Sequence, residues 1–119
     1  MAEPGSSRDA RVVLVTAPDR EAARTLARSL VGAGLAACVN LVPGVVSVYR
    51  WRGEVQEDEE VLLVAKTTAA RLPDFERALA REHPYDVPEC VALEPAAVAA
   101  GYLAWLLESC GDAGSEEGA

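Results

Sequence analysis

Two short apolar runs limit the folds open to this chain more than any other feature. "RVVLVTA" (11–17) and "VLLVA" (61–65) carry apolar side chains at adjacent positions. Because successive side chains of a strand point to opposite faces of its sheet, such runs predict strands that need cover on both faces. A chain of 119 residues has room for one hydrophobic core. We therefore predict a single domain built around a central sheet.

Two segments with apolar residues three and four positions apart predict helices. The first covers 20–33, with Asp19 as its N-cap and Gly34 ending it in the left-handed conformation. The second covers 72–82 and stops before Pro84, since the residue that precedes a proline avoids helical geometry. Each helix follows one of the central strands.

The stretch 35–67 between these helices predicts one long hairpin. Pro43 and Gly44 interrupt its first strand, which we interpret as a kink and not as a full turn. The turn itself falls at Arg52 and Gly53. The residues after the turn are acidic, so the tip of the hairpin is expected to project into solvent.

A last strand, 90–94, leads into a third helix that begins after Pro95 and ends near Ser109. One side of this C-terminal helix is expected to be buried. The residues on that side are Val98, Tyr102, Trp105 and Leu106.

This order of elements describes an α+β fold, the ferredoxin-like plait, with an antiparallel sheet, a long projecting hairpin and an extra C-terminal helix. We place the domain at 11–109, between a flexible N-terminus (1–10) and a disordered tail (110–119). The plait carries two helices on one face and leaves the other bare, whereas the central runs are apolar on both. Either the C-terminal helix or neighbouring subunits must complete the burial, and we favour neighbouring subunits.

The formal net charge of −8 argues against a nucleic-acid partner, because a phosphate backbone would be repelled. Arg20, Arg24 and Arg28 form one helical row interleaved with Glu21, and we favour a solvated helix face over a contact with nucleic acid. No apolar stretch approaches the roughly 18 residues that cross a bilayer. With a polar start that lacks a signal sequence, the expected location is the cytoplasm.

The chemistry-bearing stretch is "EHPYDVPEC" (82–90), which holds the one histidine of the chain. His83 and Glu89 are candidates for a metal site, because imidazole and carboxylate are metal ligands. The alternative is structural: the ring of His83 satisfies carbonyls at the end of the helix, and the prolines stiffen a joint. Lys66 and Tyr85 are candidates to line a ligand cleft. Lys66 either binds a small anion or pairs with a carboxylate such as Glu60 or Glu89.

Tyr49 and Trp51 lie two residues apart and so share one face of the hairpin. Stacking on a ligand is one role, but we favour contact with a neighbouring subunit, which makes both residues trimer-interface candidates. The acidic run 57–60 alternates between two faces, so at most two of its carboxylates share a cation. A solvated hairpin is the favoured interpretation of that run.

Several separated motifs resemble the CutA family of divalent-ion tolerance proteins. They are "TAPD", "LAACVNLVPGVVSVYRWRGEVQEDEEVLLVAKT", "HPYDVPE" and "YLAWL", in family order across residues 11–109. The resemblance implies a compact homotrimer joined through strands and a link to copper and other divalent cations. Copper ligation in some members involves a cysteine, a histidine and a glutamate. Here the cysteine position is Val15, and a second histidine is replaced by Glu82, which leaves His83 and Glu89.

No catalytic motif is present: the chain has no nucleophile elbow, no zinc-protease motif and no glycine-rich phosphate loop. We therefore expect a protein that is not an enzyme. The favoured function is a homotrimer that binds divalent cations, copper among them, weakly and takes part in metal-ion tolerance. The alternative is a trimeric regulatory or scaffolding protein, similar in fold to the nitrogen-regulatory PII type, that binds a small anionic metabolite or a protein.

Overall fold

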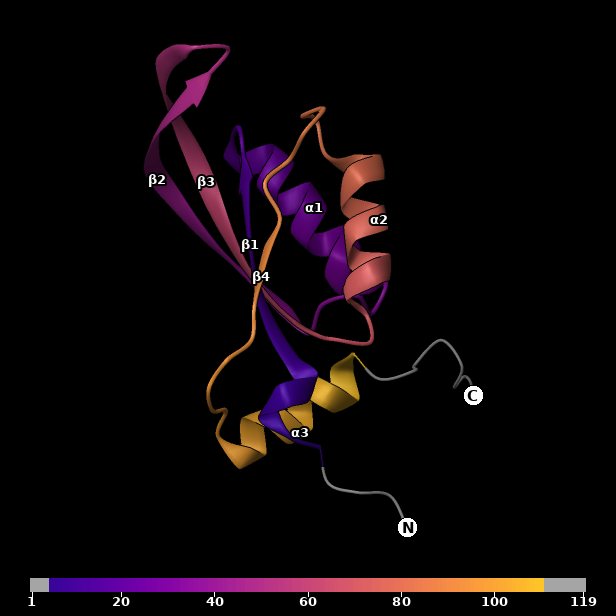
Figure 1. Ribbon diagram of the computed structural model, residues 1–119. Helices are drawn as coiled ribbons and strands as arrows, with labels where there is room; N and C mark the ends of the chain where they lie inside the picture. The colour runs from indigo at the N-terminus through magenta and orange to yellow at the C-terminus, as the bar shows by residue number, and fades with distance from the viewer. Residues whose placement is uncertain (1–4, 111–119) are drawn as a thin grey trace.

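The computed structural model describes residues 5–110 and contains one four-stranded sheet and three α-helices (Figure 1). In chain order the elements are β1 (Ala10–Ala17), α1 (Arg20–Gly32), β2 (Cys38–Trp51), β3 (Glu54–Thr68), α2 (Leu72–Glu82), β4 (Val91–Leu93) and α3 (Ala100–Ser109). The strands lie in the order β2-β3-β1-β4, and each neighbouring pair is antiparallel. This topology confirms the predicted ferredoxin-like plait.

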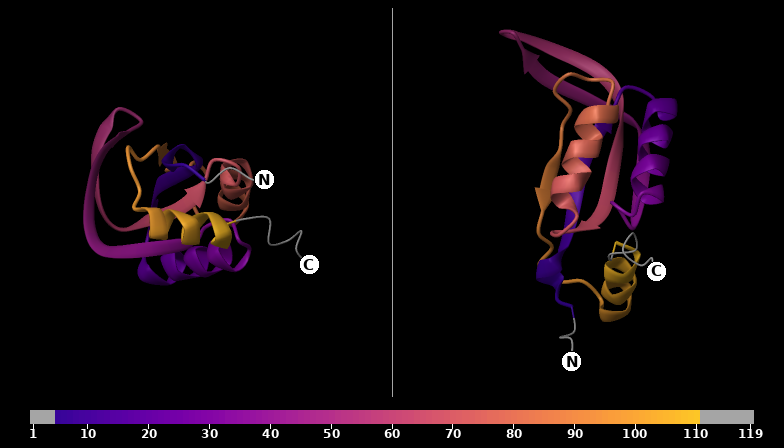
Figure 2. Two further views of the ribbon diagram at one scale, coloured as in Figure 1. Left: turned by 90° about the horizontal axis from the view of Figure 1, so that it is seen from below. Right: turned by 90° about the vertical axis from the view of Figure 1, so that its right-hand side faces the viewer.

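Helices α1 and α2 cover one face of the sheet, and the main core lies between them and strands β1 and β3 (Figures 1 and 2). The buried residues of this core alternate along the strands, as expected for side chains that point to one face. They are Val13, Val15, Ala17, Val61, Leu63 and Ala65 from the strands, and Ala23, Leu26, Ala27, Leu30, Phe75, Ala78 and Leu79 from the helices.

The opposite face of the sheet, which we call the open face, remains largely uncovered by residues 5–110. Residues paired directly across strands share a face, so the register places these side chains together: Val12, Leu14, Leu62, Val64, Val42, Val91 and Leu93. The first four are half-buried, and Val42, Val91 and Leu93 are 43%, 47% and 48% exposed. A sheet with an apolar, partly exposed face is the condition that the sequence predicted.

The local signals for α1 and for the hairpin are confirmed. Asp19 Oδ1 accepts a hydrogen bond of 2.8 Å from the Ala22 amide, and Gly34 has a φ of +74° after the helix. The kink in β2 is a β-bulge, since the register shifts between Val42 and Val45. Arg52 and Gly53 form the turn, with φ of 52° and 83°. Left-handed values at both positions match the twist of a two-residue hairpin.

Helix α3 differs from its prediction in its start and in its buried side. It begins at Ala100, and Leu103, Leu106 and Cys110 pack with Ala10 and Ala37 in a small second core. Two of the residues expected on the buried side are instead exposed, Tyr102 by 41% and Trp105 by 43%. The physical reason is that α3 lies at the end of the sheet that is opposite the tip of the hairpin (Figure 1). It therefore buries only one narrow stripe of its surface. No helix among residues 5–110 is long and apolar enough to span a membrane.

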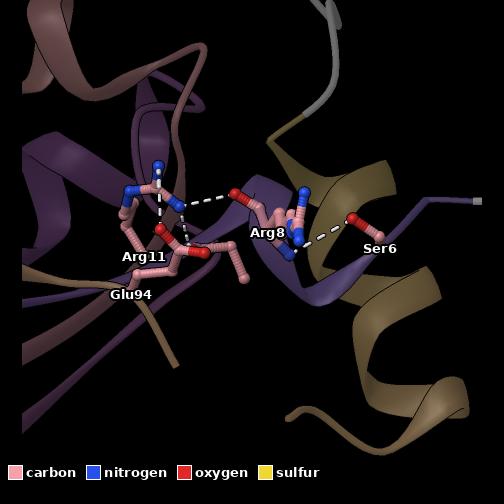
Figure 3. A network of polar contacts seen from close by, with 5 residues as sticks. Ser6, Arg8, Arg11 and Glu94 are labelled. Carbon is pink, nitrogen blue, oxygen red and sulfur yellow. Dashed lines mark hydrogen bonds and ion pairs between the residues drawn. The ribbon is translucent and has the colours of Figure 1, made fainter. Parts of the chain in front are cut away.

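Ordered structure begins before the expected boundary at residue 11. Ser7–Asp9 forms a short 3-10 turn with a capping box, in which Ser6 and Asp9 bond each other's backbone amides. The Arg11 guanidinium then donates to the carbonyls of Arg8 and Ala10 and lies 3.8 Å from Glu94 (Figure 3). These contacts attach the start of β1 to the end of β4.

The expected tail, 110–119, begins one residue too early, because Cys110 is only 3% exposed and its amide bonds the Leu106 carbonyl. Residues 111–119, like residues 1–4, lie outside the described part of the chain.

Candidate functional site

The loop after α2 is held by the ring of His83. Its Nε2 lies 2.7 Å from the carbonyl oxygen of Thr16, and its Nδ1 accepts a 3.0 Å hydrogen bond from the Tyr85 amide. Because a carbonyl only accepts and an amide N–H only donates, Nε2 carries the proton and Nδ1 carries none. His83 as a whole is 7% exposed. Both nitrogens are therefore used within the chain, and a metal ion at Nδ1 would have to displace the Tyr85 amide.

Tyr85 connects this loop to β3. Its hydroxyl donates a 2.7 Å hydrogen bond to Glu60 Oε2, and its ring lies 4.7 Å, centroid to centroid, from that of His83. Burial, followed by the hydrogen bond to Glu60 and its charge, raises the pKa of the Tyr85 phenol well above its ordinary value. The sequence suggested that Tyr85 lines a ligand cleft; in the structure its hydroxyl group is hydrogen-bonded to Glu60.

Glu60 is the unusual member of this group, because a glutamate that is only 9% exposed has no cationic partner among residues 5–110. Buried charges are normally paired. The one hydrogen bond to its side chain comes from Tyr85 and occupies Oε2. The second oxygen accepts no hydrogen bond from residues 5–110.

A second phenol and carboxylate lie on the same face, next to this pair. Tyr49 donates to Asp58, which is two residues before Glu60 on β3 and so points to the same side. The hydrogen bond to Asp58 raises the pKa of the Tyr49 phenol. Trp51 lies further toward the tip, 51% exposed, with the Arg52 guanidinium 5.5 Å from its ring centre.

Lys66 does not join this group. Its ammonium donates to the side-chain oxygen of Asn40 on the adjacent strand β2, on the open face. The expected ion pair with Glu60 or Glu89 is wrong, because six residues separate Lys66 from Glu60 along β3 and Asn40 is the nearer acceptor. Nearby, the Cys38 thiol lies 3.4 Å from the Tyr102 hydroxyl, and this contact is the main reason that the pKa of Tyr102 rises to about 12.

The donors of one chain do not by themselves fit a complete metal site. Glu89 is exposed and makes no hydrogen bond or ion pair with another described residue. Within residues 5–110 no three histidine, cysteine, aspartate or glutamate side chains come together as metal ligands. Val15, at the position where the resemblance gives a cysteine, is 1% exposed on the helix-covered face and offers no donor.

Two features of this region were not predicted from the sequence: the hydrogen bond of His83 to the Thr16 carbonyl, and the burial of Glu60. The burial of Glu60 does have a signal in the sequence. Glu60, Leu62 and Val64 alternate along β3, which places Glu60 on the same face as two apolar residues. The Thr16 carbonyl had no such signal, since any backbone oxygen can accept.

Comparison with known proteins extends this description. The model of the CutA1 divalent ion tolerance protein family matches residues 11–109. The divalent-cation tolerance protein CutA of Thermus thermophilus is 53% identical over 100 residues, which are 84% of this chain and 97% of that protein. The chloroplastic protein CutA of Arabidopsis thaliana is 49% identical over 98 residues, 82% of this chain and 54% of that protein.

Solved structures agree with the sequence relatives. The Thermus thermophilus divalent cation tolerance protein superposes with a TM-score of 0.83 at 52% identity, covering 84% of this chain and 97% of the other. The CutA1 structure from Oryza sativa gives 0.83 at 45% identity, covering 87% and 96%. The match extends from β1 through α3, and we conclude that the chain belongs to the CutA1 family of divalent ion tolerance proteins.

Proposed function

We propose that this protein acts in metal-ion tolerance as a homotrimer that binds divalent cations, copper among them, in clefts between its subunits. The observation that carries the proposal is the open face of the sheet, where apolar side chains of all four strands stay partly exposed in a single chain. An exposed apolar surface of this kind is typical of an interface. The names of the relatives supply the link to divalent cations.

Assembly would also complete the ligand set. One chain offers His83 Nδ1 and Glu89. It also offers the second carboxylate oxygen of Glu60, a residue that Tyr85 links to the same loop. The described part of one chain brings no three donors together, and we propose that a second copy supplies the rest. Binding at His83 would break its hydrogen bond to the Tyr85 amide, so we expect weak affinity. We further propose that the protein is cytoplasmic and not an enzyme; its three free cysteines support the cytoplasmic location.

Mass in solution and metal binding test this proposal together. Sedimentation equilibrium should give three times the chain mass of 12.5 kDa. Equilibrium dialysis of the trimer should then show uptake of Cu²⁺ or Zn²⁺, decreased in His83→Ala and in Glu89→Gln. A stable monomer at low concentration would refute the assembly, and the absence of any metal uptake would refute cation binding. Nucleotides and organic acids in the same dialysis series test the PII-like alternative.

A further inference from the structure

We propose that the arginine face of α1 and the groove beside it bind an acidic segment of another protein that carries apolar side chains between its carboxylates. This inference goes beyond the proposed function and rests on Arg24 and Arg28, which lie away from the depression that Arg20 shares with Glu60. The proposed cation binding and assembly involve the open face and the loop after α2, whereas α1 covers the other face of the sheet (Figure 2).

The charge on this helix is concentrated and unpaired. Arg20, Arg24 and Arg28 follow one another at four-residue spacing, so their side chains lie in one row, and all three are exposed. None of them forms an ion pair with any residue between 5 and 110, although Glu21 is three residues before Arg24. In a protein of net charge −8, three adjacent free guanidinium groups form a local site for anions.

The row is also unfavourable for the helix that carries it. Like charges four residues apart repel each other. Arg20 is the first residue of α1, at the positive end of the helix dipole, where an acidic side chain would be favourable. Sequences usually break such local preferences at functional positions. An acidic partner would remove both penalties.

Three depressions adjoin the row. One of them joins Arg20 to the carboxylates of Asp19, Glu59 and Glu60 and is therefore unsuited to an acidic partner. The other two are both lined by Arg24 and Arg28. One, of about 400 Å³, lies along the helix itself. The other, of about 460 Å³, lies between α1 and β2, and its remaining lining is apolar: Ala27, Val31, Gly32, Val39 and Leu41. Val31 is 41% exposed there, although it belongs to the apolar stripe of the helix.

The groove combines arginines with an apolar lining, which favours an acidic protein segment over a nucleic acid as its partner. A guanidinium group binds carboxylate in a planar, two-pronged manner, so arginine suits aspartate and glutamate side chains. A nucleic acid would meet the same arginines, but it has no apolar side chain for Val31 and Leu41, and the acidic remainder of the protein would repel its phosphates. An acidic and apolar protein segment satisfies both parts of the groove.

The test is fluorescence anisotropy with a short fluorescein-labelled peptide of glutamate and leucine residues and the full-length protein. We expect binding that weakens with added salt and falls by at least about tenfold in the double variant Arg24→Glu, Arg28→Glu, because both carboxylate contacts become repulsive. Arg77→Glu, Arg81→Glu is the matched control. It makes the same charge change at the same spacing on an exposed face of α2 and should bind as the unmodified protein does.

Four further measurements can refute the proposal. Val31→Ser should weaken binding without a change in charge, and equal affinity would remove the apolar floor from the site. Equal affinity of the α1 double variant, or of a peptide with glutamine in place of glutamate, would overturn the proposal. A DNA oligonucleotide of the same charge that binds as tightly as the peptide would point to nucleic acid instead. Sedimentation of the double variant should be unchanged; loss of assembly would mean that a second copy covers the groove.

Discussion

The Tyr85 hydroxyl lies 2.7 Å from Glu60 Oε2 and connects the loop after α2 to the middle of β3. This hydrogen bond is the only one that the described chain gives to the Glu60 side chain, although that side chain is 9% exposed. A phenol therefore stabilises a buried carboxylate that has no ion-pair partner among residues 5–110.

Replacement of Tyr85 by phenylalanine should destabilise the protein by about 1 to 3 kcal/mol, because it leaves a buried carboxylate without its donor. The double variant Tyr85→Phe, Glu60→Leu should recover part of that loss, since neither buried partner then lacks a hydrogen bond. Urea unfolding of the two single variants and the double variant measures the coupling. Additive losses would show that the hydrogen bond contributes nothing to stability.

The same pair predicts a dependence of stability on alkaline pH. The folded-state pKa of Tyr85 is raised above the ordinary value of 10.0, mainly by burial. Its contribution is therefore complete below pH 10.0 and decreases as the pH rises beyond it, because the unfolded chain loses the phenolic proton first. In Tyr85→Phe, the decrease in unfolding free energy above pH 10.0 should be shallower. Tyr49→Phe, at an exposed phenol, is the control and should retain most of the decrease.

His83→Ala should lower stability by about 2 to 4 kcal/mol, since the Thr16 carbonyl and the Tyr85 amide both lose their partner. Thermal unfolding without added metal measures this effect. His83→Gln supplies a side-chain donor and acceptor and should lose less. Unchanged stability in His83→Ala would contradict the structural role of the ring.

Substitution of two glycines by alanine should have opposite effects on the free energy of unfolding. Neither has an atom within 4 Å of an added Cβ, so only backbone conformation differs. Gly44, at the bulge, has a φ of +78°, and Gly44→Ala should cost about 1 kcal/mol or more. Gly32 ends α1 without a positive φ, and Gly32→Ala should raise stability by about 0.5 kcal/mol. Denaturant midpoints for the two variants are the measurement.

A charge on the open face should interfere with the proposed assembly. Leu93→Arg places a guanidinium at a position that is 48% exposed in one chain. If neighbouring copies cover this face, the variant should sediment as a monomer with native circular dichroism. Glu108→Arg, an exposed position on α3, is the control and should remain assembled. A trimer in Leu93→Arg would place the interface elsewhere.

Sequence reasoning succeeded where short-range chemistry decides the structure. Asp19 caps its helix because the acceptor and the amide are three residues apart, and Arg52 and Gly53 turn the hairpin by themselves. It failed where the deciding contact is distant. His83 meets a carbonyl 67 positions away, and α3 selects its buried stripe by the end of the sheet on which it packs. The partner of Lys66 was also missed, since Asn40 becomes its neighbour only through strand pairing.

The bulge in β2 limits which insertions and deletions the hairpin can accept in related genes. Before it, even-numbered residues of β2 face the open side; beyond it, odd-numbered residues do, because β2 contains one residue more than the paired part of β3. A single codon lost at Pro43 or Gly44 would rotate Tyr49 and Trp51 to the reverse side of the hairpin, along with every side chain up to the tip. Insertions and deletions that keep the aromatic pair in place must therefore come in twos or be matched on the returning strand.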